Sequence, residues 1–139
     1  MVDVYILIDC SWSADNLKSD VISHIHTIHK LGMTFEIYTF NSTIEMIARN
    51  QRIDDYDIGG RTCFYDSLGE LLQLIEERKP FYPPDIVIWT DGIDTGSGIY
   101  TFDTIERMVQ LYSDRGWRFT FPYIKPFTLK LKSKKNRCC

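Results

Sequence analysis

The sequence predicts an α/β domain of three layers, with a Rossmann-like, mainly parallel central sheet and an antiparallel hairpin at one edge. Apolar runs of strand length alternate along the chain with amphipathic helical stretches, the pattern of such domains. The first run, residues 2–8, is apolar almost throughout, as in a strand buried on both faces. At 139 residues the chain is long enough for one core. We expect one domain over residues 1–124, then a basic edge strand and tail over residues 125–139.

The first half of the chain predicts a strand, a helix and a hairpin. From Leu17 to Ile28, apolar residues recur at the 3.6-residue spacing of a helix, and Gly32 is a suitable stop. Asn41 and Ser42 then separate two short apolar runs, as in a hairpin. In order, this half predicts a strand over 2–8, a helix over 17–31, strands over 34–40 and 44–48, and a polar loop over 49–60.

The second half predicts two further helices and two further strands. Pro80 and Gly116 mark the ends of the helices. Pro122 is better suited to the end of a strand than to its centre, because proline has no N–H to donate. In order, this half predicts a helix from 64, a strand over 85–89, a loop over 90–98, a helix from 102, a strand over 117–124 and a short edge strand over 127–132.

Composition and charge restrict the class of protein. The hydrophobic fraction of 44% and charged fraction of 25% are those of an ordinary globular domain. Residues 125–139 hold six basic residues and no acid, whereas residues 1–124 hold ten basic and nineteen acidic residues. An acidic body does not favour DNA binding, so only the tail suits such a contact. The sequence has no transmembrane stretch or signal peptide, so we expect a cytoplasmic, intracellular protein with reduced cysteines.

Oxygen-bearing side chains follow the predicted strands. Asp9, Ser11 and Ser13 come directly after the first strand, Thr62 lies in a Gly-Gly-Arg-Thr turn before the second helix, and Asp91 lies in a Thr-Asp-Gly turn after the strand over 85–89. Ligands bind at the carboxyl ends of strands in open α/β sheets, and Mg²⁺ and Ca²⁺ prefer such oxygens. Asp and Ser are also common helix caps, which is the structural alternative for the first of these groups.

These motifs, in this order, resemble the von Willebrand factor A (vWA) domain family and its metal-ion-dependent adhesion site, in a compact intracellular form. The pattern is Asp-x-Ser-x-Ser, a distant Thr, and an Asp in a Thr-Asp-Gly turn. The resemblance implies that Ser11, Ser13 and Thr62 contact a Mg²⁺ ion, for which Mn²⁺ or Ca²⁺ are alternatives. It implies that Asp9 and Asp91 hold the ion directly or through water. In the family, a carboxylate of a partner protein commonly completes the coordination.

Three residues beside these motifs are candidates for a partner-binding rim. Trp12 stands where the family usually has glycine, and its indole is a candidate recognition residue. Arg61 directly precedes Thr62, and a guanidinium there repels a cation unless it points away or pairs with an acid such as Asp94. A degenerate site, in which Arg61 replaces the ion, is the alternative.

Three functions follow from these residues. The first is a non-enzymatic protein-interaction module, or scaffold, whose metal binds an Asp or Glu side chain of a partner. The second is a metal-dependent nuclease that uses Asp9, Asp91 and Asp94, since two-metal hydrolysis needs several acids around one pocket. The third is a metal-free structural adaptor that uses Trp12 and Arg61. The sequence does not name the partner.

Two weaker patterns have ordinary explanations. His24, His26 and His29 lie on one predicted helix, where successive residues are about 100° apart, so one ion cannot contact all three. Cys138 and Cys139 end a basic segment that is by default a solvated tail. The functional alternative for this tail is lipidation, which would bring it to a membrane.

Overall fold

The computed structural model describes residues 1–124, apart from the side chains of Trp12 and Ser13. The predicted edge strand over 127–132 and the basic tail lie outside the described residues. The strands are β1 (Val4–Asp9), β2 (Phe35–Phe40), β3 (Ile44–Arg49), β4 (Asp85–Trp89) and β5 (Arg118–Thr120). The helices are the 3-10 helix η1 (Trp12–Leu17) and the α-helices α1 (Lys18–Lys30), α2 (Phe64–Glu77) and α3 (Phe102–Asp114).

The five strands form one sheet in the order β3-β2-β1-β4-β5. β1 pairs in parallel with β2 and with β4, and β4 pairs in parallel with β5. β2 and β3 form the predicted antiparallel hairpin, whose register shifts between Ile37 and Tyr38. The chain leaves β1 for β2 on one side and returns to β4 on the other, so the strand order reverses beside β1. Ligands bind at such a switch point, at the carboxyl ends of the strands.

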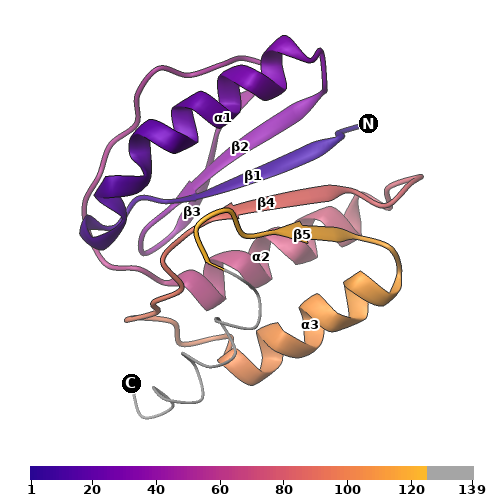
Figure 1. Cartoon of the computed structure of the whole chain (residues 1–139). Coiled ribbons are helices and arrows are strands. Elements are labelled where there is room, and N and C mark those ends of the chain that lie inside the picture. Colours follow the sequence, from indigo (N-terminus) through magenta and orange to yellow (C-terminus); the bar gives the residue numbers. More distant parts are fainter. Residues whose placement is uncertain (125–139) are drawn as a thin grey trace.

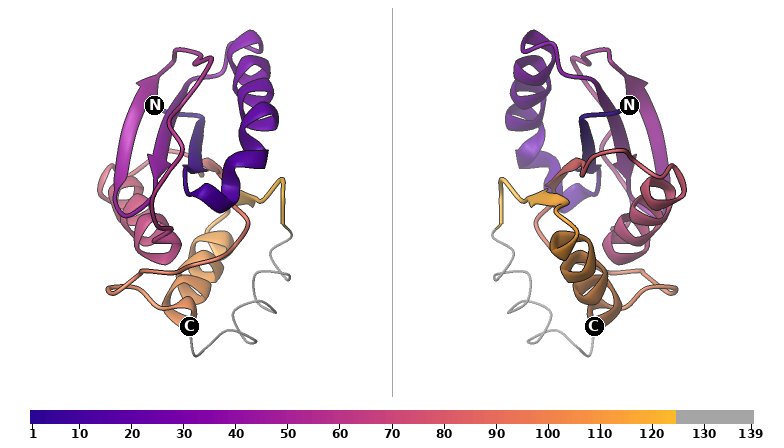
Figure 2. Two further views of the ribbon diagram at one scale, coloured as in Figure 1. Left: turned by 90° about the vertical axis from the view of Figure 1, so that its left-hand side faces the viewer. Right: turned by 90° about the vertical axis from the view of Figure 1, so that its right-hand side faces the viewer.

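The sheet separates two layers of helices, which confirms the predicted three-layer architecture (Figures 1 and 2). α1 covers one face, where Val21 and Ile25 pack with Ile6 of β1. α2 and α3 cover the other face, where Leu72 and Ile105 belong to a separate apolar cluster. All six residues of β1 are buried, which explains why its sequence is nearly continuous in apolar residues.

Two elements differ from the expectation. The strand predicted over 117–124 is only three residues long, because Pro122 and the residues around it leave the ladder of hydrogen bonds. The 3-10 helix η1, which the sequence pattern did not predict, connects β1 to α1. Within residues 1–124, no helix combines the length and the apolar character needed to cross a bilayer.

A buried carboxylate ties α2 to the sheet. Glu36 of β2 has 1% of its surface exposed and accepts hydrogen bonds from Tyr38 Oη at 2.5 Å, Arg78 Nη1 at 2.7 Å and Arg49 Nε at 2.9 Å. Burial alone would raise the pKa of Glu36, but the hydrogen bonds from Tyr38 and Arg78 outweigh it and lower the pKa. Arg78 caps the carboxyl end of α2, so this contact fixes that end of the helix.

Candidate metal centre

Two carboxylates lie side by side at the carboxyl ends of β1 and β4. Asp9 is the last residue of β1 and is completely buried, and Asp91 follows β4 by two residues and is 9% exposed. The parallel pairing of Ile8 with Trp89 brings the two strand ends together. Asp9 and Asp91 therefore lie at the same edge of the sheet, and their predicted role as metal ligands stays a prediction.

Hydroxyl groups from three separate segments contact Asp9. Its Oδ2 accepts hydrogen bonds from Thr90 Oγ1 at 2.9 Å and from Thr62 Oγ1 at 3.4 Å. Its Oδ1 accepts a hydrogen bond from the Ser11 amide at 2.9 Å, and the Ser11 hydroxyl also bonds to this carboxylate. Ser11 is the N-cap residue before η1 but makes no side-chain capping bond there, so helix capping does not account for its hydroxyl.

Thr62 reaches this site from the loop before α2. Gly60 has a φ of +83°, a left-handed conformation that favours glycine and turns the chain toward the sheet. The amide of Cys63 then donates to the carbonyl of Asn41 at 2.7 Å, which holds the loop against the end of β2. The Thr62 side chain is buried, and its hydroxyl lies 3.2 Å from the carbonyl oxygen of Ile93 as well as near Asp9.

The electrostatics of the site favour a cation. Burial raises the pKa of Asp9, the neighbouring Asp91 carboxylate adds to this, and the hydrogen bonds from Ser11 and Thr90 compensate only in part. Within residues 1–124, no basic side chain makes an ion pair with Asp9. Two close carboxylates surrounded by hydroxyls are a donor set that suits a hard divalent ion such as Mg²⁺, Mn²⁺ or Ca²⁺.

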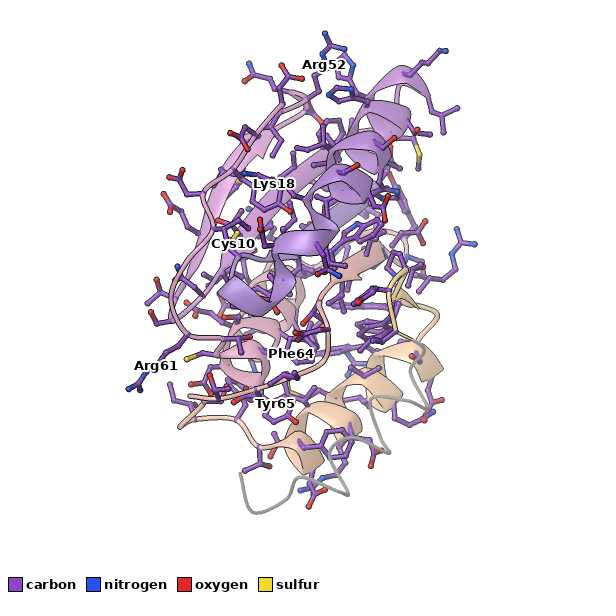
Figure 3. The ribbon with its side chains drawn as sticks, turned by 60° about the vertical axis from the view of Figure 1, so that its left-hand side comes forward. Cys10, Lys18, Arg52, Arg61, Phe64 and Tyr65 are labelled. Atoms are coloured by element: carbon purple, nitrogen blue, oxygen red, sulfur yellow. The ribbon has the colours of Figure 1, made fainter. Side chains whose placement is uncertain are left out.

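The predicted rim residues lie in different positions. The Arg61 side chain is exposed and extends away from the body of the protein, so its guanidinium does not lie among the hydroxyls (Figure 3). Asp94 accepts hydrogen bonds from the amides of Tyr65, Gly96 and Ser97, a helix-capping contact that the sequence did not predict. The side chains of Trp12 and Ser13 lie outside the described part of the chain, so their predicted roles stay predictions.

Two groups at the site were not among the predicted ligands. Thr90 directly precedes Asp91 and donates to Asp9, while its own oxygen accepts from the Gly92 amide at 3.1 Å. The carbonyl oxygen of Ile93 lies beside Thr62. Thr90 was visible in the Thr-Asp-Gly motif, but no sequence signal marks a backbone carbonyl.

Solved structures identify the fold, although no protein-family model and no curated protein matches the chain. The VWA2 protein of Sulfolobus acidocaldarius, a paralog of ArnB, matches 73% of the chain with a TM-score of 0.53 and 18% identity. The pilus adhesin SpaC of Lactobacillus rhamnosus GG, in its open conformation, matches 86% with a TM-score of 0.64 and 12% identity. The chain has a vWA-like fold. An aerotolerance-related membrane protein of Bacteroides fragilis matches 87% with a TM-score of 0.52 and 18% identity.

The vWA-like domain corresponds to part of each of these proteins. It spans 30% of the Sulfolobus chain, 23% of the Lactobacillus chain and 66% of the Bacteroides chain. At these identities the comparison concerns the fold.

Other reactive side chains of the vWA-like domain do not form a second centre. Within the described residues, no three His, Cys, Asp or Glu side chains gather in a way that could hold a metal ion. The histidines diverge as predicted: His24 lies against the Trp89 ring, and His26 bonds to Asp54. Burial raises the pKa of Cys10 to about 12, and the Asp9 charge adds to this, so the thiol is not activated as a nucleophile.

Proposed function

We propose that this domain is a non-enzymatic protein-interaction module that binds a divalent cation, Mg²⁺ in the first place, and uses it to anchor an Asp or Glu side chain of a partner. The observation that carries the proposal is the convergence of Thr62 and Thr90 on the buried Asp9 carboxylate, beside Asp91. A bound divalent ion is a large local charge, sufficient to make one carboxylate of a partner an anchor.

The donor set fits such an ion. Asp9 and Asp91 would supply the negative charge, and the hydroxyls of Ser11, Ser13 and Thr62 would supply neutral oxygens. Four of these five residues lie at the same edge of the sheet, and Asp9, Ser11, Thr62 and Asp91 are all buried. The completely buried Asp9 carboxylate makes no ion pair within residues 1–124, so its charge is costly, and a cation relieves that cost.

The charges of the body would make the cation necessary for a contact with an acidic partner, because without an ion the body and the partner repel each other. Residues 1–124 carry ten basic and nineteen acidic residues, so the body repels an acidic segment. A hollow of about 340 Å³ beside Cys10 is lined by Glu45, Asp55 and Asp57, which adds to the repulsion on that side. Arg61 is exposed near the site, and we propose that the partner approaches over it.

The alternatives have less support. The metal-dependent nuclease would need several acids around one pocket for two-metal hydrolysis. The Asp94 carboxylate instead caps α2, and the described residues hold no group of three acids, histidines or cysteines that could bind a metal. A pilus adhesin among the structural neighbours agrees with an interaction role better than with a hydrolytic one. The metal-free adaptor would use Trp12 and Arg61 instead of a metal ion, so it expects no binding of Mg²⁺ or Mn²⁺.

Isothermal titration calorimetry with Mg²⁺ and Mn²⁺ tests the proposal. We expect saturable binding to the wild-type protein and none to Asp9→Ala, because that variant removes the carboxylate on which the site converges. Asp114→Ala is the matched control, since Asp114 is an exposed carboxylate on α3 that accepts a hydrogen bond from Gln110. If neither ion binds to the wild-type protein, the proposal is refuted and the metal-free adaptor is favoured.

A further inference from the structure

We infer that two carboxylates outside the metal site, Asp66 and Asp94, set its affinity for a divalent cation by clamping the loop after β4 onto the start of α2. The inference rests on the function proposed above. Both are positioning residues, because the bonds that engage them hold the loop and the helix and make no contact with Asp9. We call Asp66, Asp94 and Ser97, with the backbone groups they bind, the loop clamp.

Asp94 joins the loop to the first turn of α2. Its Oδ2 accepts a hydrogen bond from the Tyr65 amide at 2.8 Å, and Tyr65 lies at the start of the helix (Figure 3). Its Oδ1 accepts from the amides of Gly96 at 3.1 Å and Ser97 at 3.0 Å, and the Ser97 hydroxyl donates to Oδ2. The first amides of a helix have no partner within the helix, and a negative charge there is favourable.

Asp66 makes the reciprocal contact from the helix to the loop. Its Oδ1 accepts from the amides of Ile99 at 3.0 Å and Tyr100 at 2.8 Å, and its Oδ2 accepts from the amide of Gly98 at 2.9 Å. The Asp66 amide donates to the Ser97 hydroxyl at 2.9 Å. Three successive amides therefore bind one carboxylate, and the two segments cap each other.

The loop clamp leads directly to the proposed ligands. Thr62 precedes α2 by two residues, and its carbonyl accepts from the Thr95 amide at 2.9 Å. Its hydroxyl oxygen lies 3.2 Å from the Ile93 carbonyl oxygen and 3.4 Å from Asp9 Oδ2, and the Ile93 amide donates to Asp91 Oδ1 at 3.0 Å. Thr62 and Asp91 thus belong to one hydrogen-bonded unit, while Asp9 belongs to β1.

This arrangement makes the affinity depend on the loop clamp. Mg²⁺ requires nearly ideal geometry, with ligand oxygens about 2.0–2.1 Å away, so small displacements of Thr62 or Asp91 weaken binding. Groups that orient metal ligands typically contribute about 10- to 100-fold in affinity. A competing explanation is that Asp66 acts only through its negative charge, which would attract any cation nearby.

The experiment compares Asp66→Asn, Asp66→Glu and Ser97→Ala in the full chain, by Mg²⁺ titration and by hydrogen exchange of the amides of residues 98–100. Glu70→Gln is the matched control, because it removes an exposed charge one turn further along the same helix. We expect both Asp66 variants to bind Mg²⁺ about 10- to 100-fold more weakly and to exchange faster at these amides. We expect Glu70→Gln to change neither by more than about twofold.

The outcomes separate the explanations. Recovery of wild-type affinity in Asp66→Glu would overturn the inference in favour of a purely electrostatic effect. Ser97→Ala leaves both carboxylates in place, so it tests the loop clamp if the Asp66 variants do not fold. In that case, an unchanged Mg²⁺ affinity of Ser97→Ala would overturn the inference. If the wild-type protein binds no Mg²⁺, the metal site itself is refuted. If the wild-type protein binds Mg²⁺ and the variants bind it equally well, only the role of the loop clamp is refuted.

Discussion

Replacing Asp9 with asparagine should abolish metal binding without destabilising the metal-free protein. The substitution removes a completely buried charge whose pKa is raised by burial and by Asp91. An amide oxygen can still accept the bond from the Ser11 amide. An acid whose pKa is higher in the folded than in the unfolded state destabilises the fold when it is ionised. The midpoint of thermal unfolding of metal-free Asp9→Asn is therefore expected to equal or exceed that of the wild-type protein.

The effect of Mg²⁺ on the wild-type protein can be sized. An ion at about 100 times its dissociation constant stabilises the folded state by about 2.7 kcal/mol. Unfolding entropy of about 2.1 cal/mol/K per residue, applied to 139 residues, converts this to a rise of about 9 °C in the midpoint. Differential scanning calorimetry of both proteins, with EDTA and with Mg²⁺, measures it. Asp9→Asn should show no rise.

Two results would refute this reasoning. If the unfolding midpoint of the wild-type protein does not rise with Mg²⁺, the ion does not bind at the site. An asparagine variant that loses metal-free stability but keeps its response to Mg²⁺ would make Asp9 a structural carboxylate. Asp114→Asn, on the exposed face of α3, should keep both the wild-type midpoint and the wild-type response.

Four further predictions concern the surroundings of the site. Arg61→Ala should change the Mg²⁺ dissociation constant by less than about twofold, because the guanidinium points away; a tenfold gain would show that it competes with the ion. Arg78→Ala should lower the unfolding midpoint by about 5 °C, since buried Glu36 loses a charged partner worth roughly 1.5 kcal/mol, and an unchanged midpoint would contradict this. Because the pKa of Glu36 is lowered in the folded state, its ionised carboxylate stabilises the fold, and this contribution is lost as the pH falls below 4.5. Urea denaturation at several pH values should therefore show that the free energy of unfolding falls more steeply with acid in the wild-type protein than in Glu36→Gln. Gly69→Ala should destabilise by about 1–3 kcal/mol in urea denaturation, because its Cβ would lie 2.7 Å from the Tyr100 ring, and a neutral effect would mean that the ring moves freely.

The sequence predicted the fold well where its periodicity is strong. β1 and β4 are short apolar runs, and the spacing of apolar residues in α1, α2 and α3 allows only helices. η1 and β5 were predicted poorly, because a 3-10 helix of six residues and a strand of three residues carry too few positions to show a period. The length of β5 follows from Pro122 and from pairing with β4, which a single sequence does not reveal.

The site was predictable only in part. Asp9 and Asp91 were expected at one edge of the sheet because parallel strands end there, and the pairing of β1 with β4 makes their strand ends neighbours. Thr62 lies far from both in the chain, so only the family resemblance indicated its place. A capping role for Asp66 was one reading of the sequence, but the partners of Asp66 and Asp94 were not visible, because they are backbone amides, which almost every residue type carries.

The irregular register of the β2–β3 hairpin has a consequence for self-association. A β-bulge at a sheet edge twists the outer strand and puts its free backbone groups out of step with any incoming strand. At the other side of the described sheet, β5 offers three residues, too short a template for stable pairing. Copies of this domain therefore have no regular strand edge, within the described sheet, through which to pair into a continuous β-structure.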